Sequence, residues 1–279
     1  MLVGRETELS AAVESLRAGV GGRGSVLVVS GEPGIGKSAL LAAAAAASDE
    51  WRTLRALGVE RERSVPYSTL HALLWPLRDA VDELEPRQRA LLLAMLHLGP
   101  PVEANVFAAG AAALALLSSA SESRPHALVV DDAHWADEAS QEALSFVGRR
   151  LEHERIALLA AARAGEPCLL AEERAFGQLR LDALPAELSR LLLERSAAAE
   201  IAPDVVERLL EVCAGNPLGL VELPRWLCTK ERFFAYSGEG AASGQVGCVD
   251  FGGNTKRTFT ITMLAPHSFA ELAAAFPHY

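Results

Sequence analysis

Positive charge is in short supply in this sequence. The chain of 279 residues has 26 lysines and arginines against 36 aspartates and glutamates, which gives a formal net charge of −10. A surface this acidic has no general attraction for DNA or for anionic lipid, because both carry negative charge themselves. The composition therefore excludes partners that bind through the charge of the whole surface.

Cysteines are few and scattered. Cys168, Cys213, Cys228 and Cys248 form no CxxC pair and no short spacing with a histidine, which argues against a zinc site. Isolated thiols of this kind suit a reducing cytoplasm.

Long apolar runs are also missing. The longest, at 39–47 and 107–117, fall short of the roughly 20 residues that span a bilayer. The first ten residues have neither a basic nor an apolar region of the kind found in signal peptides. We therefore expect no signal peptide, no membrane partner and a cytoplasmic protein.

Half of the residues are apolar, and they form short strand-like runs that alternate with helical segments. We expect strands at 25–30, 53–59, 126–132, 156–162 and 179–184, and helices at 5–18, 39–47 and 137–150, with 66–120 mostly helical. Strands alternating with helices predict an α/β fold of three layers around a mostly parallel sheet.

The pattern changes after Pro185, where only helices are expected, at 185–199, 203–213 and about 217–227. We therefore predict an α/β domain over 1–184, a small helical lid domain over 185–227 and a tail over 228–279. Six of the nine phenylalanines and two of the three lysines lie in that tail. This shift in composition suggests either a separate origin for the segment or a foreign or frame-shifted end. A linker-like stretch at 238–247 and a strand-like one at 255–264 fall within it.

The sequence GEPGIGKS at 31–38 matches the phosphate-binding P-loop pattern between an expected strand and an expected helix. Glycines let backbone N–H groups close around a polyphosphate, and the positive end of the following helix favours the same negative charge. We expect Lys37 to reach the β- and γ-phosphates and the Ser38 hydroxyl to bind Mg²⁺. The expected contacts of the nucleotide are Gly31, Glu32, Pro33, Gly34, Ile35, Gly36, Lys37, Ser38 and Ala39.

Two carboxylates follow the apolar strand at 126–132. Asp131 would face the P-loop at the carboxyl end of a parallel strand, where one carboxylate suffices to hold Mg²⁺. Asp132 is the candidate to orient or activate the attacking water. The structural alternative is a solvated strand end followed by a helix cap.

Two neighbouring residues admit both a functional and a structural interpretation. Arg163 ends the strand at 156–162, and it would point into the same crevice if that strand lies beside the P-loop strand; otherwise it is a strand-end arginine in solvent. His134 would either contact the γ-phosphate region or pack.

Several motifs taken together and in order resemble the STAND class of P-loop ATPases, and more narrowly the ATPase region of large ATP-binding LuxR-type transcriptional regulators of bacteria. The matching features are VGRETEL at 3–9, GEPGIGKS at 31–38, DDAHWAD at 131–137, the strand that ends at Arg163, and CAGNPL at 213–218. The resemblance covers residues 1–227. The chain carries neither the repeat-rich sensor nor the helix-turn-helix of that family, so we expect no direct DNA binding.

The resemblance implies that ATP lies between the α/β domain and the helical lid. It implies base-side contacts from Val3, Gly4 and Arg5, a lid-side contact from Pro217, and a sensor role for Arg163. It further implies an ATP-dependent switch that self-associates when ATP is bound and resets by slow hydrolysis.

The leading hypothesis is therefore an Mg·ATP switch with slow hydrolysis. One alternative is a truncated or divergent module that binds nucleotide without turnover. Another is a P-loop kinase, for which no acceptor-site signature is seen.

Overall fold

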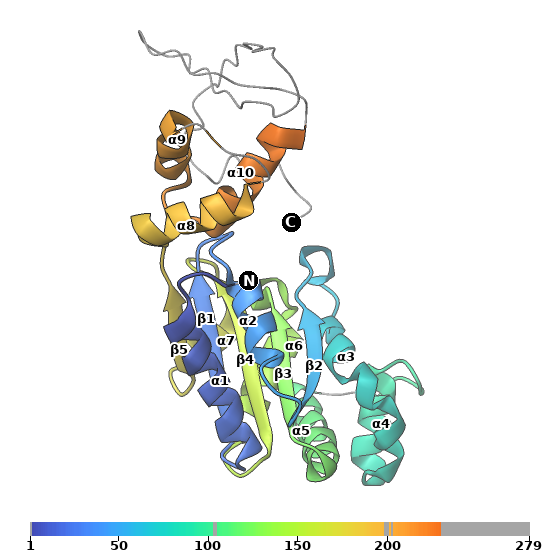
Figure 1. The fold of residues 1–279 in the computed structure, drawn as a ribbon. Coiled ribbons are helices and arrows are strands. Elements are labelled where there is room, and N and C mark those ends of the chain that lie inside the picture. The colour runs from blue at the N-terminus through green and yellow to red at the C-terminus, as the bar shows by residue number, and fades with distance from the viewer. Residues whose placement is uncertain (1, 103–104, 198–200, 202, 230–279) are drawn as a thin grey trace.

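A computed structural model describes residues 2–102, 105–197, 201 and 203–229. The predicted linker at 238–247 and strand at 255–264 lie outside the described residues. Within them, five strands form one parallel sheet in the order β2-β3-β4-β1-β5 (Figure 1). The strands are β1 Ser25–Gly31, β2 Arg52–Leu57, β3 His126–Asp131, β4 Ile156–Arg163 and β5 Gly177–Leu181.

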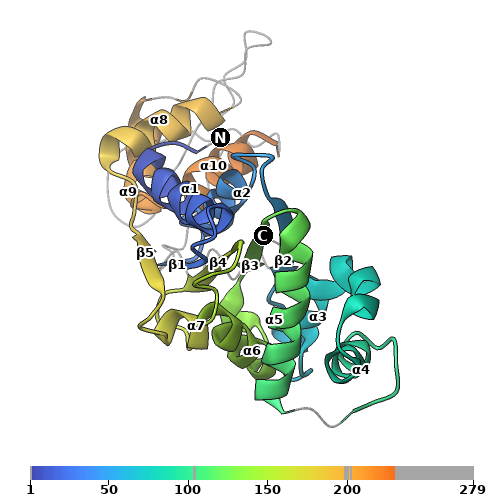
Figure 2. The same ribbon diagram turned by 90° about the horizontal axis from the view of Figure 1, so that it is seen from below.

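Helices cover both faces of the sheet, which makes the three layers that the sequence predicts (Figure 2). On one face α1, Glu6–Val20, and α2, Lys37–Ala45, pack their buried leucines and alanines against alternate residues of β1, β3 and β4. The other residues of these strands face the larger core, which includes α3, Ser68–Leu74, α5, Val106–Ser123, and α6, Glu138–Gly148. Because both faces are buried, the central strands are apolar throughout rather than alternating.

Five further elements complete the described α/β part. They are the 3-10 helices η1, Glu60–Glu62, η2, Trp75–Glu83, and η3, Ala133–Trp135, with the α-helices α4, Pro86–Met95, and α7, Leu169–Glu172.

The helix α5 is apolar and, with 18 residues, long enough by length and composition to cross a membrane. Its buried residues, among them Ala112, Leu116 and Leu117, belong to the larger core. Packing against α4 and α6 thus accounts for its apolar character.

A helical region follows the sheet, as predicted. It consists of α8, Ala186–Ser196, α9, Pro203–Cys213, and α10, Pro217–Thr229, and it lies beyond the carboxyl ends of the strands (Figure 1). The three helices share a core of their own around Leu193, Val205 and Leu220. The exact domain boundaries remain a prediction.

The strand expected at 179–184 is displaced and lies at Gly177–Leu181. The residues that follow bond elsewhere, since the carbonyl of Asp182 accepts from Arg5 and the N–H of Leu184 donates to Gly215 in the helical region. Contacts distant in sequence therefore end this strand early.

Candidate functional site

The loop between β1 and α2 is built on glycines with unusual backbone angles. Gly34 has a φ of 74° and Gly36 a φ of 100°, both in the region that side-chain-bearing residues rarely adopt. Gly36 is also the residue that precedes the first turn of α2. The loop therefore presents the free N–H groups and positive end of a nine-residue helix at the carboxyl edge of the sheet.

Lys37 lies inside this loop and is only 7% exposed. Its Nζ donates to the carbonyl oxygens of Gly31 and Glu32, both at 2.9 Å. Since an ammonium group has three donors, one remains for a further acceptor. Burial lowers the pKa of Lys37, while the nearby carboxylate of Asp132 acts in the opposite direction.

The other predicted loop residues differ in what they expose. The side chain of Ile35 is buried in the core under the loop, so only its backbone is available to a ligand. Ser38 and Ala39 are exposed in the first turn of α2, and Glu32 is exposed in the loop.

The strand β3 ends at the carboxylate pair. Asp132 adopts the left-handed conformation, with φ 46°, and its N–H donates to Asp131 Oδ1 at 3.0 Å. Such a conformation in a residue other than glycine is uncommon, and aspartate is among the residues that tolerate it.

Asp131 and Ser38 line one hollow of about 310 Å³. The other residues around it are Leu41, Arg55, Ala56, Leu57 and Val129. A carboxylate and a hydroxyl are oxygen donors of the kind that Mg²⁺ prefers, and Mg²⁺ keeps several waters as further ligands. Ser38 and Asp131 thus share one hollow and supply the kind of oxygen donors that the predicted metal site needs.

Asp132 is partly buried within reach of several charges. Burial raises the pKa of Asp132, and the neighbouring Asp131 raises it further, while Lys37 and Arg163 lower it. A carboxylate whose pKa is raised is a stronger base than an ordinary aspartate. This suits the predicted role of activating water.

Arg163 ends β4, and β4 lies directly between the P-loop strand and the carboxylate strand. In the register of β1 and β4, Gly31 is the partner of Arg163. The condition that the sequence left open is thereby met, because the arginine strand does lie beside the P-loop strand. Lys37, Asp132 and Arg163 are close enough to influence one another electrostatically.

His134 lies in η3, just beyond the two aspartates, and is 2% exposed. Its Nδ1 accepts a hydrogen bond from the N–H of Arg163 at 3.3 Å. Burial lowers the pKa of His134 to about 4, and the positive charges of Arg163 and Lys37 lower it as well. The imidazole is therefore neutral at pH 7, and it connects the carboxylate loop to the arginine strand.

The helical region contacts the P-loop at the start of α10, through one residue just before the helix and one in its first turn. Asn216 Nδ2 donates to the carbonyl of Pro33 at 2.8 Å, and the N–H of Leu218 donates to the carbonyl of Gly34 at 3.1 Å. A Cβ on Gly34 would lie only 2.8 Å from Asn216 Oδ1. Pro217 is the first residue of α10 and lies between these two contacts, so the structure brings it beside the P-loop.

The N-terminal residues Val3, Gly4 and Arg5 also join the two parts of the molecule. Val3 belongs to the core of the helical region, and a Cβ on Gly4 would lie 2.3 Å from Leu188 in α8. Arg5 is 7% exposed and donates to the carbonyl of Asp182 and to Glu8. The structure thus gives these three residues packing roles, and their contact with the base remains a prediction.

Sequence reasoning passed over Asp137, the last residue of the DDAHWAD motif. It is 1% exposed, caps α6 through the N–H of Ser140, and also accepts from the N–H groups of Tyr67 and Thr69 and from the Ser68 hydroxyl at the start of α3. An aspartate before a helix is a recognisable cap signal, but the second helix is 70 residues away in sequence. The motif therefore combines catalytic candidates with a structural double cap.

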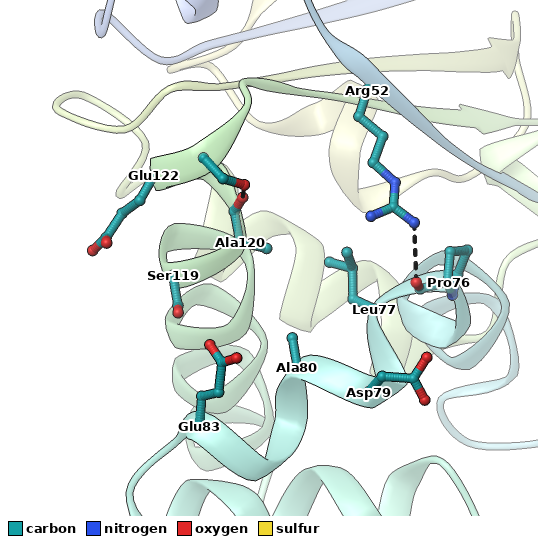
Figure 3. Close-up of a pocket in the computed structure, with 10 residues that line it drawn as sticks. Arg52, Pro76, Leu77, Asp79, Ala80, Glu83, Ser119, Ala120 and Glu122 are labelled. Carbon is teal, nitrogen blue, oxygen red and sulfur yellow. Dashed lines mark hydrogen bonds between the residues drawn. The ribbon is translucent and has the colours of Figure 1, made fainter.

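A second hollow, of about 740 Å³, lies near Arg52 at the amino end of β2 (Figure 3). Arg52 donates to the carbonyl of Pro76 at 3.1 Å, and the lining includes the carboxylates of Asp79, Glu83 and Glu122. With three carboxylates and one arginine, this hollow is unsuited to a polyphosphate. The nucleotide candidate remains the site at the carboxyl end of the sheet.

Comparison with known proteins adds the family. Residues 1–160 match the sequence profile of the AAA ATPase domain. The chain belongs to that family. No curated protein matches the sequence. The matched stretch of this AAA ATPase domain holds the P-loop and both aspartates, whereas Arg163 and α8–α10 lie beyond it.

Three solved structures that are similar to this chain have low sequence identity to it. A RuvB mutant from Thermotoga maritima has 19% identity and a TM-score of 0.48, with 80% of this chain and 61% of that chain covered. A STAND protein with a tetratricopeptide repeat sensor from Pyrococcus horikoshii has 19% identity and a TM-score of 0.48, and the match covers 78% of this chain and 29% of that chain. A chain of a HORMA:CdnC:Trip13 complex from E. coli has 13% identity and a TM-score of 0.48, and the match covers 76% of this chain and 74% of that chain. This chain thus spans about three fifths of the RuvB chains that it matches.

Proposed function

We propose that this chain is an Mg·ATP-dependent switch of the STAND type that hydrolyses ATP slowly and belongs to a bacterial signal-transduction or transcriptional regulator. The observation that supports it best is the register between β1 and β4, which puts Gly31 of the P-loop beside Arg163, with the β3 aspartates on the next strand. The proposal rests further on the sequence resemblance in the motifs quoted above.

Binding of ATP is assigned to the P-loop. The glycine-rich turn and the first turn of α2 supply backbone donors to the phosphates, and Lys37 supplies a positive charge whose Nζ is already held by two carbonyls of the loop. Because the lysine is fixed, little side-chain entropy is lost when a phosphate joins it.

Hydrolysis is assigned to Asp132. Its raised pKa suits proton abstraction from a water, and Arg163 offers a guanidinium to the charge that develops on the transferred phosphate. Mg²⁺, held by Ser38 and Asp131, would neutralise charge on the phosphate oxygens.

Switching is assigned to the joint between the P-loop and the helical region. Asn216 and Leu218 bond directly to loop carbonyls, so any movement of the loop on nucleotide binding is passed to α10. We propose that the ATP-bound form then self-associates in the cytoplasm, where ATP is available.

The experiment that tests the division of roles compares wild type with Asp132→Asn. Asparagine tolerates the left-handed conformation of this position but lacks the base. We expect the variant to bind Mg·ATP as the wild type does and to lose phosphate release by at least about a hundredfold, which is the lower range of a general-base contribution. Equal loss of binding and release would contradict this assignment. Binding by the wild type without any release would favour the alternative of a module without turnover.

A further inference from the structure

One buried nitrogen at the end of β4, the strand next to the P-loop strand, has no hydrogen-bond partner among the described residues. His134 is 2% exposed, and its Nε2 makes no hydrogen bond to any of the described residues. A buried N–H without an acceptor has given up its hydrogen bonds to water without a replacement, which is unfavourable. Groups of this kind in a folded protein call for an explanation, and a ligand that supplies the acceptor is one.

The hydrogen bond on the other side of the ring decides where the proton is. Nδ1 accepts from the backbone N–H of Arg163, so it carries a lone pair, and the proton of the neutral ring lies on Nε2. The unpartnered group is therefore a donor. It lies in the turn directly after Asp131 and Asp132.

The charges around the ring indicate which acceptor is suitable. The charges that act on the imidazole are, in order of their effect, the guanidinium of Arg163, the ammonium of Lys37, the carboxylate of Glu166 and the guanidinium of Arg63. Three of these four groups are positive. A donor surrounded by cations is best satisfied by an anionic oxygen.

We propose that the Nε2–H of His134 donates to the terminal phosphate of bound ATP and thereby distinguishes the triphosphate from the diphosphate. This inference rests on the proposed function, since the P-loop must first hold the nucleotide beside Lys37. Through its Nδ1 the same ring holds the backbone of Arg163, so the contact links the phosphate to the arginine strand.

Two substitutions separate the two ends of the ring. In His134→Asn the amide oxygen takes the place of Nδ1 and keeps an acceptor for Arg163, but no donor reaches the position of Nε2. In His134→Gln the longer amide places an N–H₂ donor near the position of Nε2 and leaves the Arg163 N–H unpaired. Thermal unfolding verifies that both variants are folded.

The readout is the ratio of the dissociation constants for Mg·ADP and for a non-hydrolysable Mg·ATP analogue, measured by calorimetry. We expect His134→Asn to raise the dissociation constant of the triphosphate analogue by about tenfold or more, which is the range of a lost hydrogen bond to a charged group. The dissociation constant of Mg·ADP should stay unchanged. His134→Gln should keep most of the preference for the triphosphate.

In the opposite pattern, His134→Asn would bind both nucleotides as the wild type does, and His134→Gln would bind both more weakly. That result would show that His134 only supports Arg163 and would overturn the inference. An unchanged ratio in both variants would overturn it as well. In either case nucleotide binding by the wild type would leave the proposed function intact. Absence of binding by the wild type would overturn both.

Discussion

Asp137 and His126 are both almost completely buried, yet their hydrogen bonding is opposite. Asp137 accepts from three backbone N–H groups and one hydroxyl. Neither ring nitrogen of His126 makes a hydrogen bond of normal geometry to the described residues, and only the backbone of Arg124 interacts weakly with the ring. Single residues of these two kinds make different predictions for stability.

Replacing Asp137 by alanine removes the acceptor for the first turns of two helices at once. Three N–H groups, two of them buried, would lose their partner, and we expect the free energy of unfolding to fall by about 3 kcal/mol or more. Urea denaturation measures this. The control is Glu138→Ala, one position further along α6, because that side chain is exposed. A loss below about 1 kcal/mol for Asp137→Ala would mean that the double cap is unimportant.

His126 predicts a dependence of stability on pH. Burial, and then the charge of Arg52, lowers the pKa of His126 to about 4 from an ordinary value of 6.5. Between these two pH values the unfolded chain binds a proton that the folded chain does not. The contribution of His126 to the free energy of unfolding is therefore fully present above about pH 6.5 and is lost as the pH drops toward 4. His134 titrates in the same direction.

His126→Leu should therefore reduce the difference in melting temperature between pH 7.5 and pH 5. Leucine fills the site without a titrating group, and the part due to His134 should persist. Melting curves of the wild type and the variant at the two pH values test this. If the difference in melting temperature between the two pH values is the same in the variant as in the wild type, the account is contradicted.

At the scale of elements, the joint between the P-loop and α10 carries the coupling. Asn216 accepts from the N–H groups of Leu218 and Gly219 and donates to Pro33. Asn105 offers a matched control, because its side chain also caps a helix, α5, through the N–H of Ala108, but it makes no contact with the P-loop.

Asn105→Ala should cost about 1 kcal/mol of stability, the usual value of a lost cap, and Asn216→Ala should cost more, because Asn216 is buried and also donates to the carbonyl of Pro33. Only Asn216→Ala should weaken Mg·ATP binding, since only that change releases the P-loop from the helical region. Calorimetry with both variants measures the difference. Equal affinities would show that this contact does not influence the nucleotide site.

The sequence predicted most elements because their signals are local. Apolar runs marked the buried strands, and the glycines and Lys37 marked the P-loop, whose conformation depends on residues next to one another. The early end of β5 could not be predicted, because it depends on bonds from Asp182 and Leu184 to residues far away in the chain. The second role of Asp137 and the partner of His134 were hidden for the same reason.

At the scale of the whole molecule, the proposed switch predicts a change of assembly. If ATP acts through the joint with the helical region, the sedimentation coefficient should increase with a non-hydrolysable Mg·ATP analogue and stay low with Mg·ADP. Sedimentation velocity over a range of protein concentrations tests this. Identical sedimentation with both nucleotides would contradict the proposed self-association.

The central claim is that the P-loop binds Mg·ATP, and a calorimetric titration of wild type and Lys37→Ala tests it most directly. The account predicts binding by the wild type and a loss of at least about tenfold in the variant, because the ammonium makes charge-assisted bonds to the phosphates. Thermal unfolding of both proteins verifies that the variant is folded. Equal affinity in the two proteins, or no heat of binding with the wild type, would contradict the account.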